Sequence, residues 1–94
     1  MYRRMRYFTR PTLLAAERDR IARGWTDQYE HPRFTRLPPG VRFPVIYDHA
    51  FHRDGWYHCV VLWPEQGIAW WMNVSFEQFR KLPAMTVHPD LHRW

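Results

Sequence analysis

The sequence predicts a small single domain of the α+β class, with a mainly antiparallel sheet of three or four strands. Its 94 residues suffice for one modest hydrophobic core. Alternating apolar side chains indicate the strands, and capping residues indicate one longer N-terminal helix and one short C-terminal helix. The expected order of elements is β-α-β-β-β-α.

Residues 1–9 are expected to form an N-terminal strand. Met5 and Tyr7 alternate with Arg4 and Arg6, so one side of the strand is apolar and the other side is basic. We interpret this segment as an edge strand with an arginine-lined outer face.

Residues 12–24 are expected to form the longer helix. Thr12 is a suitable N-cap residue, and Gly24 is a suitable stop. At helical spacing, three apolar side chains share one narrow stripe: Leu14, Ile21 and Trp25. Arg20 and Arg23 lie away from that stripe, on the face that is expected to be in solvent.

Residues 26–40 are expected to form a long connector without regular structure. Four residues that interrupt helices and strands fall within it: Pro32, Pro38, Pro39 and Gly40. Irregular segments of this length in a small domain are usually functional or mobile. The segment carries Arg33, Phe34 and Arg36, an arginine–aromatic–arginine cluster that is expected to be exposed.

Residues 41–74 are expected to form a three-stranded antiparallel meander. The first strand, residues 41–47, contains Pro44, which cannot donate a ladder hydrogen bond, and the strand is therefore placed at an edge. The second and third strands flank the four-residue turn 64–67. A polar loop over residues 48–55 separates the first strand from this hairpin.

The hairpin has a self-consistent register in which Trp63 pairs with Ile68. One face is then apolar or amphipathic throughout: Tyr57, Cys59, Val61, Trp63, Ile68, Trp70, Met72 and Val74. The opposite face is mixed: Trp56, His58, Val60, Leu62, Ala69, Trp71 and Asn73. Part of this mixed face should be covered by a helix or a partner.

The short helix is expected over residues 75–82. Ser75 and Gln78 have capping-box spacing, and Pro83 ends the helix. Residues 83–94 show no clear period and are expected to form an irregular tail. The helix–three strands–helix order of residues 12–82 resembles the topology of the double-stranded-RNA-binding domain. That family carries a Lys/Ala-rich opening on its last helix, whereas this chain has SFEQFRKLP there, so membership is not inferred.

The net charge of +5 is unevenly distributed along the chain. Residues 1–42 carry ten arginines and four acids, a net charge of +6, whereas residues 43–94 have a net charge of −1. Such segregation produces a local positive field that attracts anionic partners. Thirteen of the fourteen basic residues are arginine, whose guanidinium binds phosphate bidentately and stacks on flat rings.

Arginines interleaved with aromatic residues form the candidate binding site. Bases stack on aromatic rings while arginine neutralises phosphates. The candidate residues are Arg4, Arg6, Arg20, Arg23, Arg33, Phe34, Arg36, Arg42, Trp56 and Trp71. Most of the tryptophans are nevertheless expected in the core, because a small domain needs large apolar side chains there.

Metal-dependent and catalytic functions have little support in the sequence. Imidazoles could bind a divalent metal in two groups, but neither group has the spacing of a recognised metal motif: His49, His52, His88 and His92. Cys59 is the single cysteine and is expected to be a buried, inert thiol on a strand. Motifs for nucleotide hydrolysis or serine nucleophiles are lacking. No cofactor and no enzymatic activity are therefore predicted.

The sequence favours a small non-catalytic, cytoplasmic module that binds nucleic acid or a nucleic-acid-containing complex. An alternative is a protein-binding inhibitor of phage or mobile-element type, which blocks a host complex by occupying its partner surface. Interface cores favour tryptophan, tyrosine, methionine and arginine, so a mixed face with an arginine rim suits both. No membrane partner is expected, because no apolar stretch is long enough. An edge strand would also permit a homodimer.

Overall fold

The computed structural model describes residues 3–24, 32–47 and 54–88 of the chain. Its elements, in chain order, are β1 (Arg3–Phe8), α1 (Arg10–Ala22), η1 (Phe34–Arg36), β2 (Phe43–Tyr47), β3 (Trp56–Trp63), η3 (Pro64–Gln66), β4 (Ile68–Ser75), α2 (Phe76–Arg80) and β5 (Ala84–Val87). The five strands form one antiparallel sheet in the order β4-β3-β2-β1-β5. The predicted α+β class is confirmed, with one longer N-terminal helix and one short C-terminal helix. No helix in the described ranges is long and apolar enough to cross a bilayer.

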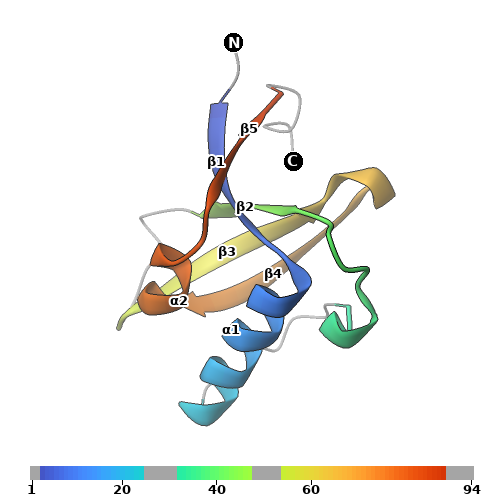
Figure 1. The fold of residues 1–94 in the computed structure, drawn as a ribbon. Helices are drawn as coiled ribbons and strands as arrows, with labels where there is room; N and C mark the ends of the chain where they lie inside the picture. Colours follow the sequence, from blue (N-terminus) through green and yellow to red (C-terminus); the bar gives the residue numbers. More distant parts are fainter. Residues whose placement is uncertain (1–2, 25–31, 48–53, 89–94) are drawn as a thin grey trace.

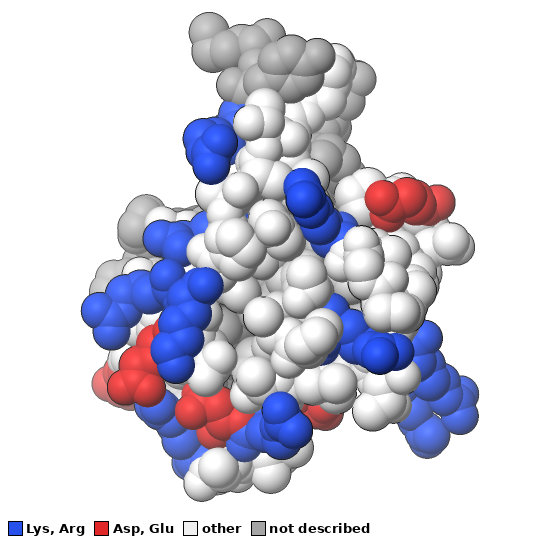
Figure 2. Space-filling model, in the orientation of Figure 1, with Lys and Arg blue, Asp and Glu red and all other residues white. Residues whose placement is uncertain are grey.

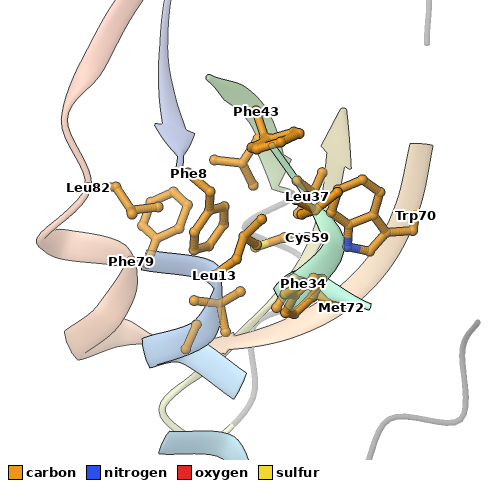
Figure 3. Close-up of a cluster of buried hydrophobic side chains, with 14 residues drawn as sticks. Phe8, Leu13, Phe34, Leu37, Phe43, Cys59, Trp70, Met72, Phe79 and Leu82 are labelled. Carbon is orange, nitrogen blue, oxygen red and sulfur yellow. The ribbon is translucent and has the colours of Figure 1, made fainter. Parts of the chain in front are cut away.

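Both helices and η1 lie on the same side of the sheet (Figure 1). Aromatic side chains from distant parts of the chain meet beneath them (Figure 3). The ring centroid of Trp70 lies 6.1 Å from that of Phe34 and 6.2 Å from that of Phe43. This core therefore joins η1, β2 and β4. The main buried cluster comprises Phe8, Leu13, Ala16, Phe34, Leu37, Phe43, Val45, Cys59, Val61, Trp70, Met72, Val74, Phe79 and Leu82.

The hairpin of β3 and β4 has the predicted register. Trp63 pairs with Ile68, and the ladder continues to Trp56 and Ser75. Gly67 closes the turn in the left-handed region at φ 64°, a conformation that glycine adopts without a steric penalty. On the face turned toward the helices, the alternating residues are buried as predicted: Cys59, Val61, Trp70, Met72 and Val74.

The opposite face of the sheet has its own small core. Leu62 is fully buried there, together with Met5 and Val87 from β1 and β5. Part of the mixed face is therefore covered at Leu62, but residues of β1 and β5 cover it and not the predicted helix or partner. On the same face, Trp71 keeps 48% of its surface exposed, whereas Trp70, directed to the helices, keeps 3%.

Two predicted edge strands lie inside the sheet instead. β1 pairs with both β2 and β5, and β2 pairs with both β1 and β3. The prediction from Pro44 was wrong because this residue lies where both ladders of β2 end. Pairing with β1 stops at Pro44, and pairing with β3 starts at Val45. The outer strands are β4 and β5, and a homodimer through an outer strand stays a prediction.

The second strand that pairs with β1 lies in the segment that was predicted to be an irregular tail. β5 forms within residues 83–94 and pairs with Arg3–Arg6 in four residue pairs. Its four residues are too short to show a period, and tertiary pairing decides their conformation. With β1 in the middle of the sheet, the helix–three strands–helix segment accounts for only three of the five strands.

The longer helix begins earlier than predicted and buries a different stripe. Thr9 is the N-cap, and its N–H donates to the Thr12 hydroxyl at 2.7 Å, so Thr12 occupies the N3 position. The buried residues of α1 are Leu13, Ala16 and Arg20, whereas the predicted stripe residue Ile21 is exposed. The short helix α2 is capped as predicted, because the Gln78 N–H donates to the Ser75 hydroxyl at 3.2 Å.

The connector is only partly irregular. Its described portion contains the single 3-10 turn η1, which directs Phe34 into the core beside Trp70. The remaining residues of the connector, 26–31, and the predicted loop residues 48–53 lie outside the described residues.

The two neighbouring tryptophans of β4 provide a test of this register. Trp70→Ala should lower the free energy of unfolding by about 3–5 kcal/mol, because the core loses a large ring and keeps a cavity. Trp71→Ala should change it by less than about 1 kcal/mol, because that ring is half in solvent. Urea denaturation followed by circular dichroism measures both. A larger loss for Trp71→Ala would show that β4 presents the opposite face.

Candidate functional site

The ten candidate binding residues do not form one surface. Figure 2 shows basic side chains in separate groups, one over β1 and α2 and another over η1, with uncharged surface between them. Only some of the ten candidate side chains are exposed to solvent; others are buried or form ion pairs within the fold. The fold therefore divides the basic N-terminal half into cations that support structure and cations that face solvent.

The first group surrounds the end of α2. Arg4 is exposed on β1, Arg6 is half-buried beside it, and Arg80 and Lys81 are exposed at the end of α2. The Arg6 Nη1 group donates to the Leu82 carbonyl at 2.8 Å and to the Arg80 carbonyl at 3.2 Å, so β1 and α2 are directly joined. We refer to Arg4, Arg6, Arg80 and Lys81 as the β1–α2 basic surface.

A cavity of about 580 Å³ opens beside this surface. It lies between β1 and β2, with Phe79 and Leu82 on the α2 side. Arg4 and Arg6 line it, as does Arg3, and none of the described lining residues is a carboxylate. The cavity therefore combines an arginine rim with lining residues of apolar and aromatic type, a combination that suits an organic anion.

The second group lies around η1. Arg33 and Arg36 are exposed at its two ends, as predicted. Phe34, however, retains only 2% of its surface, so the prediction that it is an exposed ring was wrong. The 3-10 turn points residue 34 inward because the core beside Trp70 needs an aromatic side chain there.

Arg42 is exposed and lies with its guanidinium carbon 5.1 Å from the Tyr7 ring centroid.

Arg20 of α1 and its C-cap residue Arg23 both contribute to the fold. Arg20 is buried, with 4% of its surface exposed, so its predicted position in solvent was wrong. It continues the Leu13–Ala16 stripe, and its long aliphatic stem fits that position. Arg23 forms ion pairs with Asp19 at 3.2 Å and with Glu77 at 3.0 Å.

The two candidate tryptophans differ in their surroundings. Trp56 is buried, with 8% of its surface exposed, and the guanidinium carbon of Arg23 lies over its ring, 5.7 Å from the centroid. The prediction that Trp56 is an exposed ring was therefore wrong. Trp71 is exposed as predicted, with His58 at its edge and 4.7 Å between ring centroids. Trp71 stands on β4, and Arg4 stands on β1, with β3 and β2 between their strands. The structure therefore does not bring this ring to the β1–α2 basic surface.

Sequence reasoning missed several residues of this site. Arg80 and Lys81 lie in the half of the chain with net charge −1, and that average concealed a local pair of cations. The aromatic walls of the cavity, Tyr47 and Phe79, contact each other with ring centroids 4.5 Å apart. The only sequence signal for the pair of cations is their position next to the helix-ending Pro83.

Metal and nucleophile chemistry have no assembled site in the described ranges. There, no three side chains of His, Cys, Asp or Glu come together as potential metal ligands. His88 is exposed at the end of the described residues, and the other candidate ligands lie outside them: His49, His52 and His92. Cys59 is buried as expected, and this burial raises the pKa of its thiol far above the ordinary range.

The buried thiol predicts a specific dependence of stability on pH. The unfolded thiol ionises above about pH 8.5, whereas the folded thiol keeps its proton. The Cys59 contribution is therefore fully present below that pH and declines as pH rises, by at most about 1.4 kcal/mol per pH unit. Urea denaturation between neutral and alkaline pH should show a steeper decline for wild type than for Cys59→Ala. Parallel declines would show that the folded thiol also ionises.

Comparisons with known proteins assign no relative to this architecture. No family model matches the chain, and no curated protein or solved structure shows significant similarity to it.

Proposed function

We propose that this protein binds nucleic acid through the β1–α2 basic surface and performs no catalysis. The observation that carries the proposal is the proximity of these cations. Arg4 and Arg6 line the cavity between β1 and β2, and the Arg6 Nη1 group donates to the carbonyl of Arg80, the residue before Lys81. Phosphate contacts dominate the affinity of nucleic-acid-binding proteins, and arginine and lysine supply most of the charge. The four cations of this surface are suited to track a phosphate backbone.

The cations of this surface are available for a ligand. Within the described residues, Arg4, Arg80 and Lys81 have no ion pair. Glu77 is the acid on the same helix, and Arg23 engages it at 3.0 Å. Glu77 also lies beside Arg80 and Lys81, so this single carboxylate is shared among three cations, and an approaching polyanion would supply further counter-charge.

A second candidate function is binding to a protein. The observation in its favour is the outer strand β4, which carries no charged side chain and exposes Ile68 and Trp71. Exposed aromatic residues on an unpaired strand edge are typical of protein contacts. In nuclease-treated lysate, a protein partner would stay bound to wild type and be lost from Trp71→Ala, whereas a nucleic-acid ligand would be removed by the nuclease.

The salt dependence of oligonucleotide binding tests the first proposal. If the four cations contact phosphates, the logarithm of the association constant should fall with the logarithm of salt concentration, with a slope of about −3 for a single strand. Fluorescence anisotropy with short DNA and RNA strands and duplexes measures this slope. No binding of any of them at low salt would exclude the nucleic-acid function.

Matched double variants locate the surface. Arg80→Gln/Lys81→Gln should reduce the slope by about 1.4, because two phosphate contacts are lost. Arg33→Gln/Arg36→Gln removes the same charge from exposed positions at η1 and should change the slope much less. Equal reductions would mean that binding follows net charge and has no defined surface.

A further inference from the structure

The cavity between β1 and β2 exists because the two strands separate. They pair only through Tyr7–Pro44 and Phe8–Phe43. From there, the N-terminal part of β1 follows β5, while Val45–Tyr47 of β2 follows β3. The main chains of the separated segments border a space of about 580 Å³, which lies in the size range of sites for small organic ligands.

Arg6 is held in a fixed position at this cavity. Two carbonyls accept hydrogen bonds from its Nη1 group, at 2.8 Å from Leu82 and 3.2 Å from Arg80. Its guanidinium carbon also lies 5.2 Å from the Phe79 ring centroid. An anion would therefore meet a guanidinium that has already lost its rotamer freedom, which reduces the entropic cost of binding.

Arg4 and Arg6 keep donors without partners in the described part of the chain. The Nε and Nη2 groups of Arg6 form no hydrogen bond there, and Arg4 forms neither a hydrogen bond nor an ion pair. Both side chains lie on the same side of β1, because residues two apart on a strand share a face. Each guanidinium offers a fork of N–H donors that suits the oxygens of a phosphate group, and both line the same cavity.

The lining residues other than the arginines are apolar or aromatic in type. They consist of Met5, Val45, Ile46, Tyr47, Phe79, Leu82 and Ala84. A free phosphate would leave this part of the cavity unfilled. A phosphate joined to a flat, weakly polar body matches both halves of the lining, and a nucleotide has that combination.

We infer that the cavity binds one unpaired nucleotide of a single strand, with its phosphate on Arg4 and Arg6 and its base against the apolar walls. This inference rests on the proposed function and narrows it. A nucleotide inside a duplex is paired and stacked and would have to be extruded to enter. The protein should therefore prefer single strands to duplexes of the same length.

Filling the cavity tests the inference. Ala84 lines the cavity from the outer strand β5 and is exposed, so Ala84→Phe should fold and block entry. Ala69→Phe is the matched control, because Ala69 is also exposed on an outer strand and does not line the cavity. With a fluorescein-labelled oligothymidylate, Ala84→Phe should weaken binding about tenfold, the effect of losing one stacked base. The control should bind within about twofold of wild type, since most substitutions outside a contact region are near-neutral.

A second pair of variants tests the arginines. Arg4→Gln should weaken binding more than Arg18→Gln, which removes the same charge from an exposed position on α1. Thermal melting confirms that each variant is folded. Tighter binding of duplex than of single strand, or equal binding by wild type, Ala84→Phe and Ala69→Phe, would overturn the cavity site while leaving the nucleic-acid function intact. Failure of wild type to bind any oligonucleotide would instead overturn the proposed function.

Discussion

The sharing of β1 between two neighbours is the constraint on which the rest of the structure depends. Its last two residues pair with β2, and its first four pair with β5. This division places β5 beside β1, accompanies the contact of Arg6 with the Arg80 carbonyl of α2, and separates the strands that border the cavity. A longer β1–β2 ladder would close that gap and remove the candidate site.

The arginines of this chain perform two kinds of work. Arg6, Arg20 and Arg23 are part of the architecture, through carbonyl contacts, burial and ion pairs, respectively. Others remain in solvent, where their charge is available to an anion. Arg6 belongs to both kinds, because a guanidinium has more donors than its two carbonyl partners require. Net charge alone therefore overestimates the number of arginines that can bind an anion. The contacts that each arginine makes within the fold decide whether it can do so.

The aromatic residues are divided in a similar way. Trp56, Phe34 and Trp70 are buried because a chain of 94 residues must fill its core with a few large side chains. Trp71 remains exposed on the opposite face of the sheet. The predicted overlap of exposed rings and arginines is therefore replaced by an arginine-rimmed cavity, whose aromatic groups are wall residues rather than projecting rings.

The class of fold, the hairpin register, the cap of α2 and the inward position of Trp70 could be predicted from the amino-acid sequence. These features depend on local patterns: side chains alternate between the two faces of a strand, and capping residues have a fixed spacing. The sequence also identified Arg4 and Arg6 as members of a basic strand face. Three features follow from the folded arrangement and not from the sequence pattern: β1 and β2 are interior strands, Arg20 is buried, and Arg80 and Lys81 lie beside Arg6. Those outcomes depend on contacts between residues far apart in the chain, such as the pairing of β1 with β2 and with β5. Local sequence patterns do not encode the energies of such contacts.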